Sequence, residues 1–363
     1  MATAETFHPV IARINPVNAC ASYGERIIEK MRISYTDRTK AAERVADALH
    51  AVGPVEYLEP EILPATEEVP LVRSRFVATV RHNRTGHRHQ MLITSPLSTE
   101  EQSDELICTL PGITQNPSQG NANLAHRSFA DAHPDMKVIS IHTDGIGEHD
   151  RLKFWQALHH PFIGMAQSRL DILQQLTGGS PVHLNGFSMS TALVVKITNM
   201  NESSQQINIG SKTLISPAIV TPDKAKYVMG YEFLPYAYRT ELEQAAARRI
   251  GAIAVIYKGM KELQLPCIGN ALQLGQGTEA LAFLQAASGS PLAIIYGSED
   301  PLAQPNLYKQ AAAQNPGNVH IIKKYRRGHS VSDPSYATEI AVDIRRFTQS
   351  STTDSRAVEQ YAA

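Results

Sequence analysis

The stretch that decides the fold is PVHLNGFSMSTALVV, residues 181–195. A Gly-Gly-Ser breaker precedes it, its apolar first half predicts a short strand, and its second half predicts the start of a helix. Ser188 falls at the turn between them, where its hydroxyl is exposed beside a helix N-terminus that favours developing negative charge. Gly186 and Ser190 are small, so strand and helix can pack closely. We therefore interpret Ser188 as a candidate nucleophile.

Two more polar residues follow predicted strands farther along the chain. An apolar run at 292–296 leads into Gly-Ser-Glu-Asp, which ends at Asp300. A run at 319–322 is followed by Arg-Arg-Gly-His, which ends at His329. Open α/β sheets gather functional groups at the carboxyl ends of their strands, so we expect Ser188, Asp300 and His329 to meet. Taken singly, Asp300 could be a helix cap and His329 a surface histidine.

The chain order Ser, Asp, His, together with the Gly-x-Ser-x-Ser turn, resembles the α/β-hydrolase fold superfamily, whose commoner turn is Gly-x-Ser-x-Gly. The resemblance covers residues 75–348. It implies that Ser188 is the nucleophile, that His329 is the general base, and that Asp300 orients the histidine and stabilises its charged form.

The resemblance also implies an oxyanion hole, formed by the backbone amides of Ile113 and Met189. Ile113 follows Pro111-Gly112, a turn where the family commonly has His-Gly. A second departure lies at 142–149, which resembles the fourth-strand signature of the family but has His142 and His149 in place of Asp and Ser.

The implied fold is α/β, with a mostly parallel sheet of the eight-stranded type flanked by helices. The hydrolase core is expected at residues 73–219 and 289–349, and a helical cap is expected to interrupt it at 220–288. An N-terminal helical extension is expected at 1–72 and a flexible tail at 350–363. The cap contains clustered aromatics, which could line an acyl pocket or form a small core of the cap itself: Tyr227, Tyr231, Phe233, Tyr236 and Tyr238.

The composition limits which kinds of binding partner the sequence predicts. Lys plus Arg total 34 against 35 for Asp plus Glu, so no electrostatic feature predicts nucleic acid as a partner. The apolar runs are too short for a membrane span, and the first residues do not resemble a secretory leader. Three widely spaced cysteines without a CxxC pair indicate a reducing compartment or simple buried thiols, and we expect a cytoplasmic protein. The sequence leaves a homodimer open.

No metal or organic cofactor is expected, because the chemistry implied for Ser188 needs none. His87 and His89 would share one strand face, but no third ligand has suitable spacing, so we predict two solvated histidines on an edge strand.

Three functions fit this pattern. The first is a serine hydrolase that cleaves a carboxylic ester or thioester, or a lactone or amide, as its small-molecule acyl substrate. The second is an acyltransferase that uses the same three residues. The third is a non-catalytic binding protein that retains the fold. The intact Ser, Asp and His argue against it, whereas the departures at 111, 142 and 149 keep it open.

Overall fold

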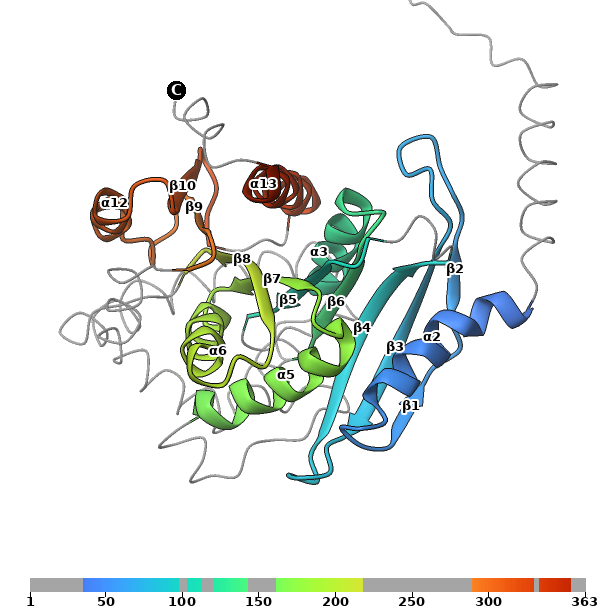
Figure 1. Cartoon of the computed structure of the whole chain (residues 1–363). Coiled ribbons are helices and arrows are strands. Elements are labelled where there is room, and N and C mark those ends of the chain that lie inside the picture. The colour runs from blue at the N-terminus through green and yellow to red at the C-terminus, as the bar shows by residue number, and fades with distance from the viewer. Residues whose placement is uncertain are drawn as a thin grey trace, which may run out of the picture.

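A single mixed sheet organises the chain (Figure 1). The computed structural model describes residues 35–97, 103–112, 120–142, 161–217, 289–329 and 333–353. Within them the strand order is β1-β3-β4-β6-β5-β7-β8-β9-β10, and β2 also pairs with β3. The sheet is open, and helices cover both of its faces. The predicted α/β architecture with flanking helices is therefore confirmed.

The strands alternate with helices along most of the chain. The strands are β1 Val55–Tyr57, β2 Glu61–Leu63, β3 Arg73–Arg81, β4 Arg88–Pro96, β5 Leu106–Leu110, β6 Lys137–Ile141, β7 Pro181–Phe187, β8 Asn208–Ile215, β9 Leu292–Gly297 and β10 Val319–Lys324. The helices are α2 Tyr35–Leu49, α3 Gly120–Ala132, α5 Pro161–Thr177, α6 Ser190–Ser204, α12 Pro305–Gln314 and α13 Pro334–Thr353. The strands from β5 to β10 are mutually parallel, whereas β1 to β4 join the sheet in antiparallel pairings.

Eight of the described strands, β3 to β10, correspond to the predicted eight-stranded type. The two additional strands, β1 and β2, lie in the region expected as an N-terminal helical extension. Both are short, and both pair with the outer edge of β3. Helix α13 continues to Thr353, three residues past the point where a flexible tail is expected. The predicted cap at 220–288 lies outside the described residues.

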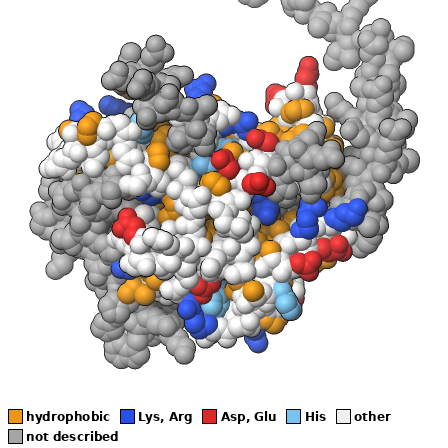
Figure 2. Space-filling model, viewed as in Figure 1, with side chains coloured by type: hydrophobic (Ala, Val, Ile, Leu, Met, Phe, Trp, Pro, Cys, Tyr) orange, Lys and Arg blue, Asp and Glu red, His pale blue; other side chains and the backbone are white. Residues whose placement is uncertain are grey.

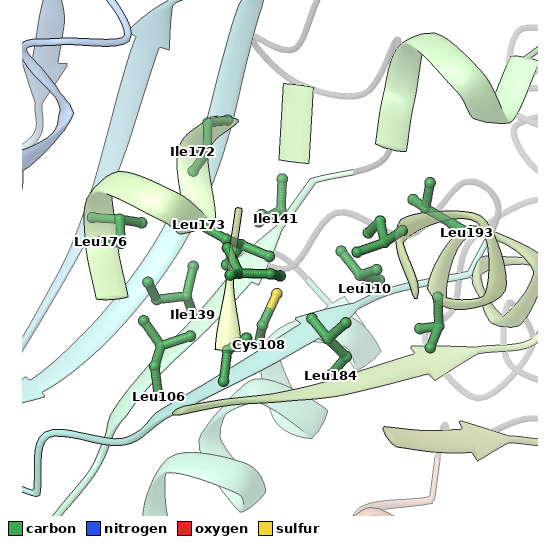
Figure 3. Packing of buried hydrophobic residues seen from close by; sticks show 14 of the residues in the cluster. Leu106, Cys108, Leu110, Ile139, Ile141, Ile172, Leu173, Leu176, Leu184 and Leu193 are labelled. Atoms are coloured by element: carbon green, nitrogen blue, oxygen red, sulfur yellow. The ribbon is translucent and has the colours of Figure 1, made fainter. Parts of the chain in front are cut away.

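The central strands are buried along their whole length because helices cover them on both sides. Every residue of β5 and β9 is buried. On one face, apolar side chains of α2, α5, α6 and α12 pack against the sheet, and on the other face α3 and α13 do so. Figure 3 shows the first face, where Leu106, Cys108 and Leu184 of the sheet meet Leu173 of α5. Each such leucine contributes about 1.5–3 kcal/mol by leaving water.

A buried polar network lies beneath α3. His126 is hydrogen-bonded through Nδ1 to Ser140 at 2.7 Å and through Nε2 to Thr94 at 2.9 Å. The Ser140 hydroxyl also forms a short hydrogen bond with Thr109. These bonds satisfy polar groups that would otherwise be costly to bury. Burial, reinforced by the positive charge of Arg75, lowers the pKa of His126 to about 3, so its imidazole is neutral.

The surface combines both signs of charge. On the face shown in Figure 2, acidic and basic side chains are interspersed among apolar ones. None of the described helices combines the length and apolar character required to cross a bilayer. The prediction of two solvated histidines on an edge strand is wrong for His89, because β4 lies between β3 and β6 and the His89 side chain is buried. Its ring packs near His82 and His87 instead.

The neutral state of His126 predicts a pH-dependent stability. Between its ordinary pKa of 6.5 and about 3, the unfolded chain binds a proton at this histidine and the folded chain does not. The free energy of unfolding therefore rises with pH across this window, and it falls again on acidification. For this group the slope is at most about 1.4 kcal/mol per pH unit. Urea unfolding at several pH values should show a shallower slope for His126→Gln than for wild type.

The matched control for this measurement is Thr94→Val, which removes a hydrogen-bond partner but leaves the imidazole buried. It should lower stability while retaining the pH slope. Equal slopes for wild type and His126→Gln would show that His126 does not contribute.

Candidate active site

Ser188 occupies a strained turn directly after β7. Its backbone has φ of 51°, in the left-handed region that non-glycine residues rarely adopt. Such a conformation costs on the order of 1–3 kcal/mol and persists only where surrounding structure enforces it. Here the Ser188 N–H donates to the carbonyl of Ile215 at 2.8 Å, and the Ser188 carbonyl accepts from the Thr191 hydroxyl at 2.6 Å. The turn thus presents the serine hydroxyl beyond the strand end.

Small neighbours make this turn sterically allowed. A Cβ on Gly186 would lie 2.6 Å from the carbonyl oxygen of Ser190 and 2.7 Å from a methyl of Val194. Any larger residue at 186 would push helix α6 away from β7. Ser190, where the family more often has glycine, donates a short hydrogen bond from its hydroxyl to the carbonyl of Pro111. This bond therefore joins the start of α6 to Pro111, the residue directly after β5.

A continuous hydrogen-bonded chain joins the three predicted residues. His329 Nε2 lies 2.7 Å from Ser188 Oγ, and His329 Nδ1 lies 3.0 Å from both carboxylate oxygens of Asp300. Because the carboxylate can only accept, Nδ1 carries the proton and Nε2 accepts from the serine hydroxyl. The Asp300 side chain is 0% exposed and the His329 side chain 9%. The carboxylate also accepts the N–H of Leu302 at 2.9 Å, which fixes its orientation.

The turn that carries Asp300 and the loop that carries His329 are bonded to each other. They continue the parallel pairing of β9 with β10: the Ser298 N–H donates to Lys324 at 2.8 Å, and the Glu299 N–H donates to Arg327 at 2.9 Å. The Ser298 hydroxyl accepts the N–H of Arg326 at 2.9 Å. A Cβ on Gly297 would lie only 2.0 Å from the Arg327 carbonyl oxygen, so this close approach requires glycine.

The predicted oxyanion-hole residues are only partly described. Met189 immediately precedes α6, with φ of −61° and ψ of −31°, so its amide lies at the helix N-terminus beside Ser188. Ile113 lies outside the described residues, although Pro111 and Gly112 before it are buried. Of the two histidines at departures from the family pattern, His149 is also outside, whereas His142 is buried and its carbonyl accepts from Arg169 at 3.0 Å.

A second Ser, His and acid group, which the sequence does not predict, lies inside the fold. His183 Nδ1 is 2.8 Å from Ser211 Oγ, and His183 Nε2 is 3.2 Å from a carboxylate oxygen of Glu105. Gly210 leaves room for the ring, since a Cβ there would lie 2.9 Å from the imidazole. His183 and Ser211 are each 1% exposed, and Glu105 precedes β5, at the strand ends opposite Ser188. No substrate can reach this serine.

Other side chains suited to metal binding or nucleophilic chemistry are few in the described part of the chain. No group of three or more His, Cys, Asp or Glu side chains there could hold a metal ion. Burial raises the pKa of the Cys108 thiol to about 12, so this cysteine is not a thiolate at neutral pH. Ser188 is therefore the candidate nucleophile that the geometry supports.

Comparison with known proteins establishes the fold. No protein-family model matches the sequence, and no curated protein shows detectable similarity to it. The structure is similar to ferulic acid-bound Est1E from Butyrivibrio proteoclasticus, with a TM-score of 0.50 at 13% identity over 73% of this chain and 97% of that chain. The epoxide hydrolase VrEH1 from Vigna radiata gives 0.49 at 11% identity, over 75% of this chain and 97% of that one.

A hydrolase from Oleispira antarctica gives a TM-score of 0.49 at 15% identity, over 70% of this chain and 94% of that one. At 13% identity the likeness to Est1E concerns the fold alone. The chain has the α/β-hydrolase fold, as its resemblance in sequence implies.

The contact at Gly297 predicts a severe effect of one added methyl group. Gly297→Ala would force the Arg327 carbonyl, and with it the histidine loop, away from the Asp300 turn. Overpacking of this kind costs about 1–3 kcal/mol, which urea unfolding would detect. The matched control is Gly164→Ala in α5, where nothing lies within 4 Å of the added Cβ and alanine favours the helix by about 1 kcal/mol. Equal stabilities for the two variants would contradict the close approach.

Proposed function

We propose that this chain is a serine hydrolase that cleaves a carboxylic ester or thioester through an acyl-enzyme at Ser188, with lactones and amides as substrates of the same chemistry. The observation that carries the proposal is the chain from Ser188 Oγ through His329 to Asp300, at 2.7 and 3.0 Å. It combines a half-buried serine just beyond a strand end, a base within reach of the hydroxyl and a buried carboxylate behind the base.

The first step forms the acyl-enzyme. The Ser188 hydroxyl transfers its proton to His329 Nε2 as Oγ attacks the substrate carbonyl carbon. The imidazolium that results is stabilised by Asp300, which accepts the Nδ1 proton in a hydrogen bond but does not take it. Because the Asp300 side chain is shielded from water, its charge acts on the histidine with little screening.

The tetrahedral oxyanion needs donors that are already in place. The Met189 amide, at the start of α6, is one, and the helix N-terminus adds its partial positive charge. We assign the second donor to the Ile113 amide. Each donor of this kind lowers the barrier by about 3–4 kcal/mol in mutational tests. The bond between Ser190 and Pro111 joins the two segments that would supply these donors.

Collapse of the oxyanion releases the leaving group, which takes the proton from His329. Water then attacks the acyl-enzyme with His329 again as base, and the acid leaves. Acyl transfer differs only in the acceptor, so product analysis with and without an added alcohol or amine distinguishes the two outcomes. The fold indicates the reaction class but not the acyl group.

Labelling by a fluorophosphonate probe tests the nucleophile. Wild type should become labelled, Ser188→Ala should not, and His329→Ala should react at least about a thousandfold more slowly. Labelling is read by intact-mass spectrometry at neutral pH.

The fold supplies its own control, because Ser211 has a similar histidine and acid behind it but is buried. Ser211→Ala should be labelled as readily as wild type. Folded wild type that stays unlabelled would contradict the proposal and favour a binding protein that retains the fold.

A further inference from the structure

One side chain in the histidine loop is anchored to α13 by several contacts. Arg327, two residues before His329, donates from Nη1 to Asp333 at 2.6 Å and from Nη2 to Ser335 at 3.1 Å. Nη2 also forms a short hydrogen bond with Glu339. The guanidinium carbon lies 5.3 Å from the centre of the Tyr336 ring. All four partners belong to α13 or directly precede it.

These partners are themselves held in place. The Asp333 carboxylate caps α13, accepting the N–H and the hydroxyl of Ser335 at 2.9 Å each. Tyr336 is 1% exposed and packs in the core cluster that includes Phe187 of the strand before Ser188. The guanidinium of Arg327 is therefore attached to an element that is packed against the nucleophile strand.

The main chain of the same residue is fixed from the opposite side. The Arg327 carbonyl accepts the Glu299 N–H at 2.9 Å and abuts Gly297, so it contacts the turn that carries Asp300. Arg327 thus connects the acid turn to α13, and the chain reaches His329 two residues later. The Arg327–Asp333 ion pair also joins the segment just before His329 to the residue that precedes α13.

We propose that Arg327 is a positioning residue that holds His329 in line between Asp300 and Ser188. The inference rests on the proposed function, which it deepens by naming what orients the base. Arg327 contacts neither substrate nor the reacting atoms; it acts through the loop.

Orientation, not stability, is the expected contribution. The Arg327 side chain is 25% exposed, and its partners Asp333 and Glu339 are 48% and 42% exposed, so water screens these ion pairs and they add little to the free energy of unfolding. The planar guanidinium, however, donates in fixed directions and stacks on an aromatic ring, which an ammonium cannot reproduce. The 2.7 Å contact between His329 and Ser188 depends on such alignment.

The test compares Arg327→Gln and Arg327→Lys with a matched variant, Lys324→Gln. Lys324 also pairs with α13, through Asp343 and, at 4.0 Å, through Glu339, which Arg327 contacts as well. Its side chain, however, leaves from strand β10 and not from the histidine loop. The second-order rate of Ser188 labelling by the fluorophosphonate should fall about 10- to 100-fold in Arg327→Gln, as for a small misplacement of a catalytic group. Arg327→Lys should recover only part of the rate, and Lys324→Gln should keep it.

Two further readouts separate positioning from loss of structure. The urea midpoint should be nearly the same in wild type and Arg327→Gln. The low-field proton resonance of His329 Nδ1–H should be present in wild type and in Lys324→Gln but broadened in Arg327→Gln.

The proposal would be overturned if Arg327→Gln were labelled as fast as wild type. It would also be overturned if Arg327→Gln lost labelling rate together with a matching fall in its urea midpoint. An unlabelled wild type would contradict the proposed function instead. In that case the His329 Nδ1–H resonance would still test the positioning role, because an unchanged signal in Arg327→Gln would overturn it.

Discussion

The 2.7 Å hydrogen bond between His329 Nε2 and Ser188 Oγ joins two residues that are 141 positions apart in sequence. It can form only if β7, β8, β9 and β10 lie side by side in parallel, so that their carboxyl ends meet at one edge of the sheet. Even β8, which contributes none of the three residues, supports the bond, since its last carbonyl accepts the N–H of Ser188. The distance between His329 and Ser188 therefore depends on the pairing of all four of these strands.

The two groups of Ser, His and acid in this chain show that the position of a serine in the fold determines whether it can act as a nucleophile. Ser188 stands on left-handed backbone beyond a strand, next to a helix N-terminus. Ser211 lies within β8, directly after an irregularity in the pairing of β8 with β7 at Gly210, and is buried with His183. Similar side chains thus give a candidate nucleophile in one place and a satisfied polar contact in the other. Burial lowers the pKa of His183, and the hydrogen bond and charge of the neighbouring Glu105 oppose that shift.

The backbone geometry around the site could be predicted where it follows from a local sequence pattern. The small residues around Ser188 predict a sharp turn, and the strand endings before Asp300 and His329 predict a shared sheet edge, where the structure brings the three together. Prediction failed where contacts depend on tertiary packing. The partners of His183 and Arg327 come from other elements, and β1 and β2 are short strands in a Pro- and Glu-rich stretch that form only because β3 has a free edge.

The most direct test of the central claim is to trap the acyl-enzyme itself. Wild type would be mixed with excess p-nitrophenyl acetate, quenched in acid and analysed by intact and peptide mass spectrometry. We predict a mass increase of one acetyl group on the peptide that contains Ser188, together with a burst of p-nitrophenol stoichiometric with enzyme. Hydrolysis without any acyl adduct, or an adduct on another residue in place of Ser188, would contradict the account.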